Sequence, residues 1–272
     1  MNQPSASESR LNIEQIRLTI TDIHDPENLR KNYESFRQEL EILIGVPVEF
    51  LVVNNPIEAA SALRLNQVDI ALAGPSEYVV ITSRTNAVPL VGITRPNYYS
   101  IIATKTPNNI NNLSNLKGKA IALSDIGSTS GHLGPMKLLM DAGLNPASDV
   151  EILMLRDEGS IQALKQGKVA AWGGSAVDYA TFLNSQENFP ILAQTVSLPS
   201  DILMVSSQID PETVAGIRAL ITSNAESLIT ALAQGEATQK YRGSKLVEVR
   251  DSDYDFIRQV YQQIGEGNLI KQ

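Results

Sequence analysis

Apolar and polar positions along this chain follow two periods in turn, and the alternation predicts strands and helices one after the other. Residues 14–23 and 46–53 are short runs rich in β-branched and aliphatic side chains, which is typical of strands. Residues 26–44 carry apolar side chains at helical spacing, between Pro26 and Gly45. The pattern up to residue 94 is strand–helix–strand–helix–strand–helix–strand, which indicates an α/β fold.

The same alternation restarts near residue 98. We therefore expect two α/β lobes of about 100 residues each, with mostly parallel sheets because helices separate successive strands. Strands are expected at 98–104, 119–124, 150–155, 168–173, 190–196 and 201–206, and helices at 131–142, 159–166, 175–184, 211–222, 224–234 and 252–264.

The order of these elements also predicts how the lobes are connected. The second α/β pattern is inserted into the first, so the chain would cross between the lobes near 95–103 and again near 197–204. Two crossing strands would act as a hinge. The expected division is a disordered lead-in at 1–13, a first lobe at 14–95 plus 205–272, and an inserted second lobe at 96–204.

Composition then narrows the class of function. The 272 residues are 43% hydrophobic and 19% charged, which is ordinary for a globular protein. A formal net charge of −8 and the lack of a basic run argue against a nucleic-acid partner. The chain has no cysteine, and two histidines cannot form a three-histidine metal site. We expect neither a metal nor another cofactor.

One segment of the second lobe has the features of an anion-binding turn. Residues 125–131, which we call the cradle, follow the strand at 119–124 and precede a helix. The first amides of a helix lack partners and carry a partial positive charge, and hydroxyl donors at Ser128, Thr129 and Ser130 would add to them. Gly131 would allow its amide to approach a ligand closely. The alternative is an ordinary helix cap, since serine and threonine are favoured there.

Five motifs resemble one family, in the same order and at similar spacing. They are Gly45-Val-Pro-Val-Glu49, residues 66–78 ending in Gly-Pro-Ser-Glu-Tyr78, Tyr98-Tyr-Ser-Ile-Ile-Ala-Thr-Lys105, Leu116-Lys-Gly-Lys-Ala-Ile-Ala122 and Ser128-Thr-Ser-Gly131 with Pro135. Pro199-Ser-Asp-Ile202 is similar to a further family motif. The chain thus resembles the periplasmic solute-binding proteins of phosphonate, phosphite and phosphate ABC importers, over most of residues 14–235.

This resemblance implies further ligand-binding residues outside the cradle. Tyr78 either donates a phenol hydrogen bond to the ligand or is a partly buried aromatic residue. Of Tyr98 and Tyr99, which should face opposite sides of a strand, the family pattern favours Tyr98. Asp157 lies near the position of a family histidine, with Arg156 and Glu158 as neighbours that could exchange roles with it. Asp201 matches a family aspartate.

Carboxylates beside an anion are explicable if the ligand carries a proton. Asp157 and Asp201 could accept a hydrogen bond from monohydrogen phosphate or hydrogen phosphite, whereas sulfate has no proton to give. The alternative for both is a solvated loop acid. Trp172-Gly-Gly174 offers no carboxylate for an ammonium tail, which favours a small ligand, and Trp172 itself is expected in the core. His132 is expected to lie behind the ligand contacts or on the helix surface.

The predicted function is that of a binding protein without enzymatic activity. It would capture phosphite, phosphate or methylphosphonate between two lobes and deliver it to an ABC permease, as a monomer. The resemblance implies a periplasmic location, with an export signal outside this sequence and a lipid anchor as an option in the precursor. The alternatives are a ligand-sensing module of a signalling system and an enzyme acting on a phosphate ester. No P-loop lysine follows the cradle, which argues against nucleotide chemistry.

Overall fold

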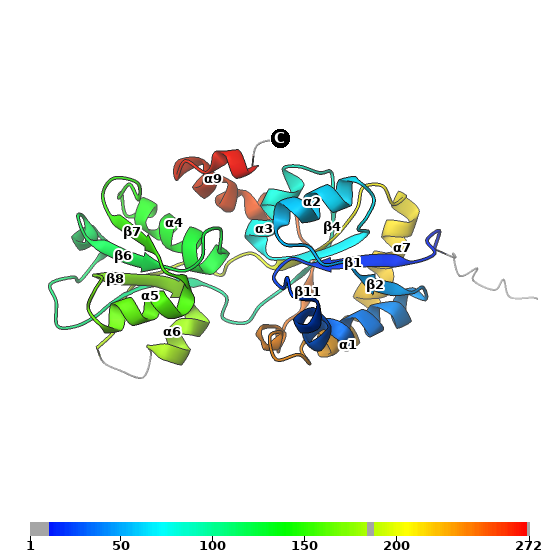
Figure 1. Cartoon of the computed structure of the whole chain (residues 1–272), viewed down its shortest axis with the longest axis horizontal. Helices are drawn as coiled ribbons and strands as arrows, with labels where there is room; N and C mark the ends of the chain where they lie inside the picture. The colour runs from blue at the N-terminus through cyan, green and yellow to red at the C-terminus, as the bar shows by residue number, and fades with distance from the viewer. Residues whose placement is uncertain (1–10, 184–187, 271–272) are drawn as a thin grey trace, which may run out of the picture. The chain divides into compact units, whose positions relative to one another are not determined.

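The structure, a computed structural model, describes residues 11–183 and 188–270. The chain forms two compact units, which are described separately (Figure 1). Unit 1 contains the described residues up to 74 together with 80–96 and 200–250; unit 2 contains the described residues of 75–79, 97–199 and 251–272. Among the described residues, no helix combines the length and apolar character needed to cross a bilayer.

Two features of this division differ from the expected one. The C-terminal residues 251–272 were expected with lobe 1, whereas they are grouped with unit 2, as is the first turn of α3 (Pro75–Thr82). The physical reason is contact with residues Thr129–Leu133, against which α9 (Asp255–Gln263) packs and to which the Ser76 amide donates, while the rings of Tyr78 and Tyr254 lie 4.5 Å apart. The first ten residues of the expected lead-in and the last residue of the helix at 175–184 lie outside the described residues.

Unit 1 is built on a six-stranded mixed sheet. Strand β1 (Ile16–Ile20) is parallel to both of its neighbours, β2 (Val48–Phe50) at the edge of the sheet and β3 (Ile70–Ala73). Strand β10 (Asp201–Val205) then enters antiparallel between β3 and β4 (Val88–Ile93), and β11 (Leu246–Val247) pairs antiparallel with β4. The sheet is therefore mixed: β1, β2, β3 and β4 run in one direction, as the helices between them predict, and the returning strands β10 and β11 run antiparallel to them.

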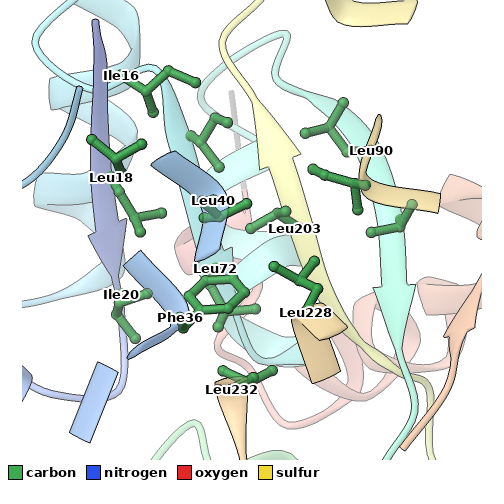
Figure 2. Close-up of a cluster of buried hydrophobic side chains, with 14 of the residues drawn as sticks. Ile16, Leu18, Ile20, Phe36, Leu40, Leu72, Leu90, Leu203, Leu228 and Leu232 are labelled. Atoms are coloured by element: carbon green, nitrogen blue, oxygen red, sulfur yellow. The ribbon is translucent and has the colours of Figure 1, made fainter. Parts of the chain in front are cut away.

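Helices α1 (Pro26–Ile44), α7 (Pro211–Ser223) and α8 (Ala225–Leu232) pack against one another beside this sheet (Figure 1). Helix α1 begins where the Asp25 side chain accepts from the Asn28 amide and ends at Gly45, whose φ of 79° favours glycine. Its Phe36 and Leu40 meet Leu203 of β10 in the core (Figure 2). The other helical segments of unit 1 are α2 (Pro56–Arg64) and η3 (Gln239–Tyr241).

Unit 2 has a five-stranded mixed sheet in the order β7-β6-β8-β5-β9. Strand β6 (Ala120–Leu123) is parallel to both β7 (Glu151–Met154) and β8 (Ala171–Ser175), so the carboxyl ends of these three strands lie at one edge. Strands β5 (Ser100–Thr104) and β9 (Ile191–Gln194) complete the sheet with antiparallel pairs. Ligands of open α/β sheets bind outside such carboxyl ends, and this edge holds the cradle.

A helical segment follows each of the three parallel strands. After β6 the chain makes a π-helical turn, η2 (Thr129–Leu133), which continues into α4 (Gly134–Asp141). Helix α5 (Arg156–Lys165) follows β7, and α6 (Ala176–Phe182) follows β8. The remaining helical segments of unit 2 are η1 (Leu113–Leu116), η4 (Asp251–Tyr254), α9 (Asp255–Gln263) and η5 (Gly267–Ile270).

Candidate anion-binding site

The cradle is a tight turn that opens into a widened first helical turn. Gly127 has a φ of 85°, a backbone conformation that favours glycine. The side-chain oxygen of Ser128 accepts from the Gly131 amide at 3.1 Å, while the Ser128 carbonyl accepts from the amides of His132 and Leu133 at 3.0 Å each. The five-residue span from Leu133 back to Ser128 makes this turn π-helical, a form often found at functional sites.

This arrangement leaves hydrogen-bond donors available at the start of the helix. The amides of Thr129 and Ser130 have no hydrogen-bond partner among the residues that the structure describes. Ser128 and Ser130 are partly exposed, and the Ser128 oxygen, which accepts from Gly131, can still donate its own hydrogen. Two amides and two hydroxyls are thus placed at a positive helix end, which is a suitable environment for an oxyanion.

Thr129 has a different role from its two serine neighbours. It is buried, and its side-chain oxygen accepts from the Ser76 amide at the start of α3 at 3.1 Å. This bond ties the cradle to a second helix N-terminus within unit 2. The Thr129 hydroxyl hydrogen can still be donated, but its oxygen is already engaged by the protein.

Gly131 is required by packing rather than by access of its amide to a ligand. The amide donates to the Ser128 side chain, so it is not among the unpaired donors of the cradle. A β-carbon at this position would lie 2.4 Å from the β-carbon of Ser124, far inside a normal contact. The two residues also share a backbone bond, from the Ser124 amide to the Gly131 carbonyl at 3.0 Å. Glycine therefore lets the helix start lie directly against the end of β6.

Asp157 is brought to the cradle through Ser124. It lies in the first turn of α5, and one of its carboxylate oxygens accepts from the Ser124 hydroxyl. The Leu155 amide donates to the Leu123 carbonyl at 3.0 Å, which holds the start of α5 beside the end of β6. The Asp157 side chain is exposed, so its second oxygen can face a ligand. Arg156 instead points to Asp125, with 3.7 Å between its Nε and the carboxylate.

A second carboxylate at this edge was missed by the sequence reasoning. Asp178 lies in the first turn of α6, where Ser175 accepts from its amide at 3.0 Å and donates to its carboxylate at 2.5 Å. Burial, together with the negative charge of Asp157, raises the pKa of the Asp178 carboxyl. The spacing Ser-x-x-Asp, a capping signal, could have identified this pair.

Trp172 is a core residue, as expected. It is fully buried, and its indole Nε1 donates to the Ser160 hydroxyl at 2.9 Å. Gly174 lies against this ring, because a β-carbon there would be 1.9 Å from the nearest ring atom.

The phenol of Tyr78 is engaged with the C-terminal segment. It donates to the Asp251 carboxylate at 2.8 Å, its ring stacks on Tyr254, and it is almost fully buried. Burial and the neighbouring Asp251 raise the pKa of the Tyr78 phenol well above its usual range. Of the two readings of Tyr78, the structure favours the buried aromatic.

Tyr78→Phe should therefore lower stability without lowering anion affinity. The lost hydrogen bond should reduce the free energy of unfolding by about 0.5–1.5 kcal/mol, while the ring packing is kept. Thermal unfolding and calorimetric titration of the same sample measure the two effects. An affinity loss with unchanged stability would instead assign Tyr78 to the ligand.

Tyr98 is also buried, at 6% exposure, and its carbonyl accepts from the Leu198 amide at 2.8 Å. Tyr99 packs, partly buried, against the hydrophobic core of unit 2. The two side chains therefore have different surroundings, as expected for neighbours on a strand.

Asp201 belongs to unit 1 and lies in a buried polar cluster there. Its Oδ2 accepts from the Tyr241 phenol at 2.7 Å and lies 3.4 Å from a guanidinium nitrogen of Arg95. Its Oδ1 is buried and has no partner within the described part of the chain. Burial and the charge of Asp201 raise the pKa of the Tyr241 phenol, so this residue remains a donor. The sequence reasoning did not identify Arg95 or Tyr241.

His132 is buried behind the cradle rather than on the helix surface. Its Nδ1 accepts from the Gly127 amide at 3.1 Å. Burial lowers the pKa of this histidine to about 4, so the ring is neutral near pH 7. Among the described residues, no three metal-ligating side chains are grouped as a metal site would need.

Comparison with known proteins identifies relatives of this chain. The family described as "ABC transporter, phosphonate, periplasmic substrate-binding protein" matches residues 18–254. A protein of Mycolicibacterium smegmatis named "Phosphate-import protein PhnD" is 25% identical over 274 residues, which cover 91% of this chain and 85% of that protein.

Solved structures with the same fold cover nearly the whole chain. XAC2383 from Xanthomonas citri, bound to a chloride ion, has a TM-score of 0.75 at 18% identity and covers 93% of this chain and 98% of its own. PhnD1 from Prochlorococcus marinus, in complex with methylphosphonate, has a TM-score of 0.68 at 16% identity and covers 93% and 99%. The fold is that of the two-lobed periplasmic binding proteins.

Proposed function

This chain belongs to the family of periplasmic substrate-binding proteins of phosphonate ABC transporters, and we propose that its cradle captures a small phosphorus oxyanion for delivery to a membrane permease. The proposed ligands are phosphite, phosphate and methylphosphonate. The observation that carries this proposal is the start of η2, where unpaired amides at Thr129 and Ser130 meet the hydroxyls of Ser128 and Ser130. The closing of two lobes on the ligand, expected from the two chain crossings, is part of the proposal.

The cradle donors account for capture but not for discrimination among oxyanions. Each charge-assisted hydrogen bond contributes about 1.5–3 kcal/mol, so four of them give roughly 6–12 kcal/mol before the costs of desolvation and ordering. Micromolar binding needs about 8 kcal/mol net, so groups beyond the four must also contribute. Because every phosphorus oxyanion presents similar oxygens to the cradle, selectivity has to come from the acidic groups around it.

Asp157 and Asp201 supply the proposed selectivity for a protonated oxyanion. The second oxygen of Asp157 beside the cradle is an acceptor that a ligand hydroxyl can satisfy, and Asp201 is proposed from the family motif, with an Oδ1 that has no partner in the described part of the chain. Sulfate has no proton to donate near neutral pH and would leave a carboxylate facing a bare anion. Tyr98 remains a proposed contact, supported by the sequence motif alone.

Asp178 does not favour an aminoalkylphosphonate. Residues 172–174 contain no carboxylate, but Asp178 follows shortly after them in the chain. An ammonium group would pair with Asp178 only in its ionised form. The Ser175 hydroxyl already donates to one of the Asp178 oxygens, and burial, which raises the pKa of the carboxyl, makes its charged form more costly than it is in water. The name of the M. smegmatis relative, a phosphate-import protein, also supports a small ligand. Since the homologues are transport binding proteins, we further propose that the site carries out no covalent chemistry.

Calorimetric titration near pH 8 tests the ligand class. Phosphite, phosphate and methylphosphonate should each compete for one site, with sulfate at least about a hundredfold weaker, because it would place a bare anion beside a carboxylate without a hydrogen bond between them. Tighter binding of 2-aminoethylphosphonate than of all three small anions would overturn the proposal, and so would sulfate binding as tightly as phosphate. Turnover of phosphate esters would contradict the absence of chemistry.

A further inference from the structure

His132 stands directly behind the cradle, where a histidine would ordinarily be taken for a cation that attracts the anion. Its contacts indicate another role. The ring is 3% exposed, and its Nδ1 accepts the Gly127 amide at 3.1 Å. A nitrogen that accepts an N–H carries no proton itself, so this bond requires the neutral ring with its proton on Nε2.

The bond closes the turn that presents the ligand donors. Gly127 directly precedes Ser128, and the Ser128 carbonyl accepts from the His132 and Leu133 amides. The Ser128 side chain in turn caps Gly131. Residues 127–132 are therefore held as a ring of hydrogen bonds in which the imidazole satisfies the amide next to the first ligand-binding residue.

We propose that His132 is a positioning residue that fixes the cradle as an uncharged hydrogen-bond acceptor and adds no positive charge to the bound anion. The inference rests on the proposed function, because it assumes that the cradle binds the anion. It explains how a buried histidine can lie beside an anion site without making that site depend on its protonation.

The ionisable groups around η2 support a neutral ring. The elements packed against η2 include α4, α9 and β8, as well as the start of α3, where the Ser76 amide donates to Thr129, and β5, where the Ser100 hydroxyl donates to the Ser130 carbonyl. Strand β8 contains no ionisable side chain, and in α4 Lys137 pairs with Asp141. From α9, the Tyr261 phenol faces the turn, 3.4 Å from where a β-carbon of Gly127 would lie.

Other ionisable groups near the cradle belong to α9 and to the turn itself. Burial, followed by the charges of Glu266 and Glu77, raises the pKa of the Tyr261 phenol, so this group is uncharged. In α9 Arg258 pairs with Asp255, and on the turn Asp125 faces Arg156. No carboxylate among the described residues forms a hydrogen bond with His132 that would favour its charged form.

The sign of the pH effect follows from the lowered pKa. The folded protein keeps His132 neutral until the pH approaches about 4, whereas the unfolded chain binds that proton near 6.5. Between these values the unfolded state holds more protons, so this group makes stability fall as the pH is lowered from 6.5 to 4. Above pH 6.5 its contribution to stability does not change.

Two substitutions distinguish a role of His132 as a hydrogen-bond acceptor from a role in filling space. His132→Asn places an oxygen where Nδ1 lies but is smaller than the ring, whereas His132→Leu fills the space and has no acceptor. With phosphite, phosphate and methylphosphonate titrated separately, we expect His132→Leu to bind about tenfold more weakly, the effect of one unsatisfied amide. His132→Asn should retain most of the affinity. The reverse order would overturn the inference and assign His132 a packing role.

The pH profile gives a second measurement that does not depend on the leucine variant folding. The affinity of the natural protein divided by that of His132→Asn cancels the protonation of the ligand. This ratio should stay constant from pH 8 to pH 5.5, and a change centred near pH 6.5 would overturn the inference. If the natural protein binds none of the three anions, the proposed function fails; if it binds and His132→Leu binds equally well, only the role of His132 fails.

Discussion

Ser128→Ala should weaken binding of the phosphorus oxyanion about ten- to a hundredfold, because a hydroxyl donor to a charged ligand contributes about 1.5–3 kcal/mol. The same change should also destabilise the fold by about 0.5–2 kcal/mol. The second effect follows from the structure, since the Ser128 oxygen accepts the Gly131 amide and so caps η2. Isothermal titration calorimetry and thermal unfolding measure the two losses separately.

Ser130→Ala is the matched comparison for this experiment. Ser130 offers a hydroxyl to the ligand from the same turn, but its side chain caps nothing among the described residues. Its loss should therefore lower affinity by a similar factor and leave the melting temperature unchanged, while Ser128→Thr should keep the cap. Unchanged affinity in both alanine variants would refute the cradle as the anion site.

Gly131→Ala should have the largest combined effect on stability and binding. The added methyl group would lie 2.4 Å from the β-carbon of Ser124, so the start of η2 has to move away from β6. Overpacking of this kind costs about 1–3 kcal/mol. Because binding constellations must be held within about 0.5 Å, the displaced amides should lose about a hundredfold in affinity. Thermal unfolding and calorimetry again measure both losses.

Two further variants test the cause of this effect. Gly267→Ala makes the same chemical change where the nearest atom is 3.7 Å away, and it should leave both quantities unchanged. In the Gly131→Ala background, Ser124→Gly removes the colliding atom and should restore part of the melting temperature. Additive losses in that double variant would show that the collision with Ser124 is not the cause.

Much of this architecture was predictable because local signals are strong where elements begin and end. Pro26 and Gly45 bound α1 as expected, and the strand–turn–helix order around residues 119–142 was correct. The motif Ser128-Thr-Ser-Gly131 indicated the family, and the family match over residues 18–254 confirms it. These features depend on neighbours in the sequence, namely backbone preferences, capping and periodicity.

What the sequence could not determine depends on contacts between distant residues. Strand direction in both sheets was decided by β5 and β10, which pair antiparallel with strands far along the chain. Tyr78 donates to Asp251, 173 residues away, and α9 packs against η2, so residues 251–272 are grouped with unit 2. No local pattern encodes such a partner.

The candidate site likewise has features that the sequence predicts and features that depend on tertiary contacts. Sequence alone placed the cradle donors, since helix starts and hydroxyl residues are adjacent in the chain, and it selected Asp157 and Asp201 by resemblance. Tertiary structure decided what each group does: Ser124 orients Asp157, Tyr241 and Arg95 hold Asp201, and packing makes Gly131 a necessity. Burial also turned His132 from a possible cation into a neutral acceptor, because desolvation depends on everything packed around the ring.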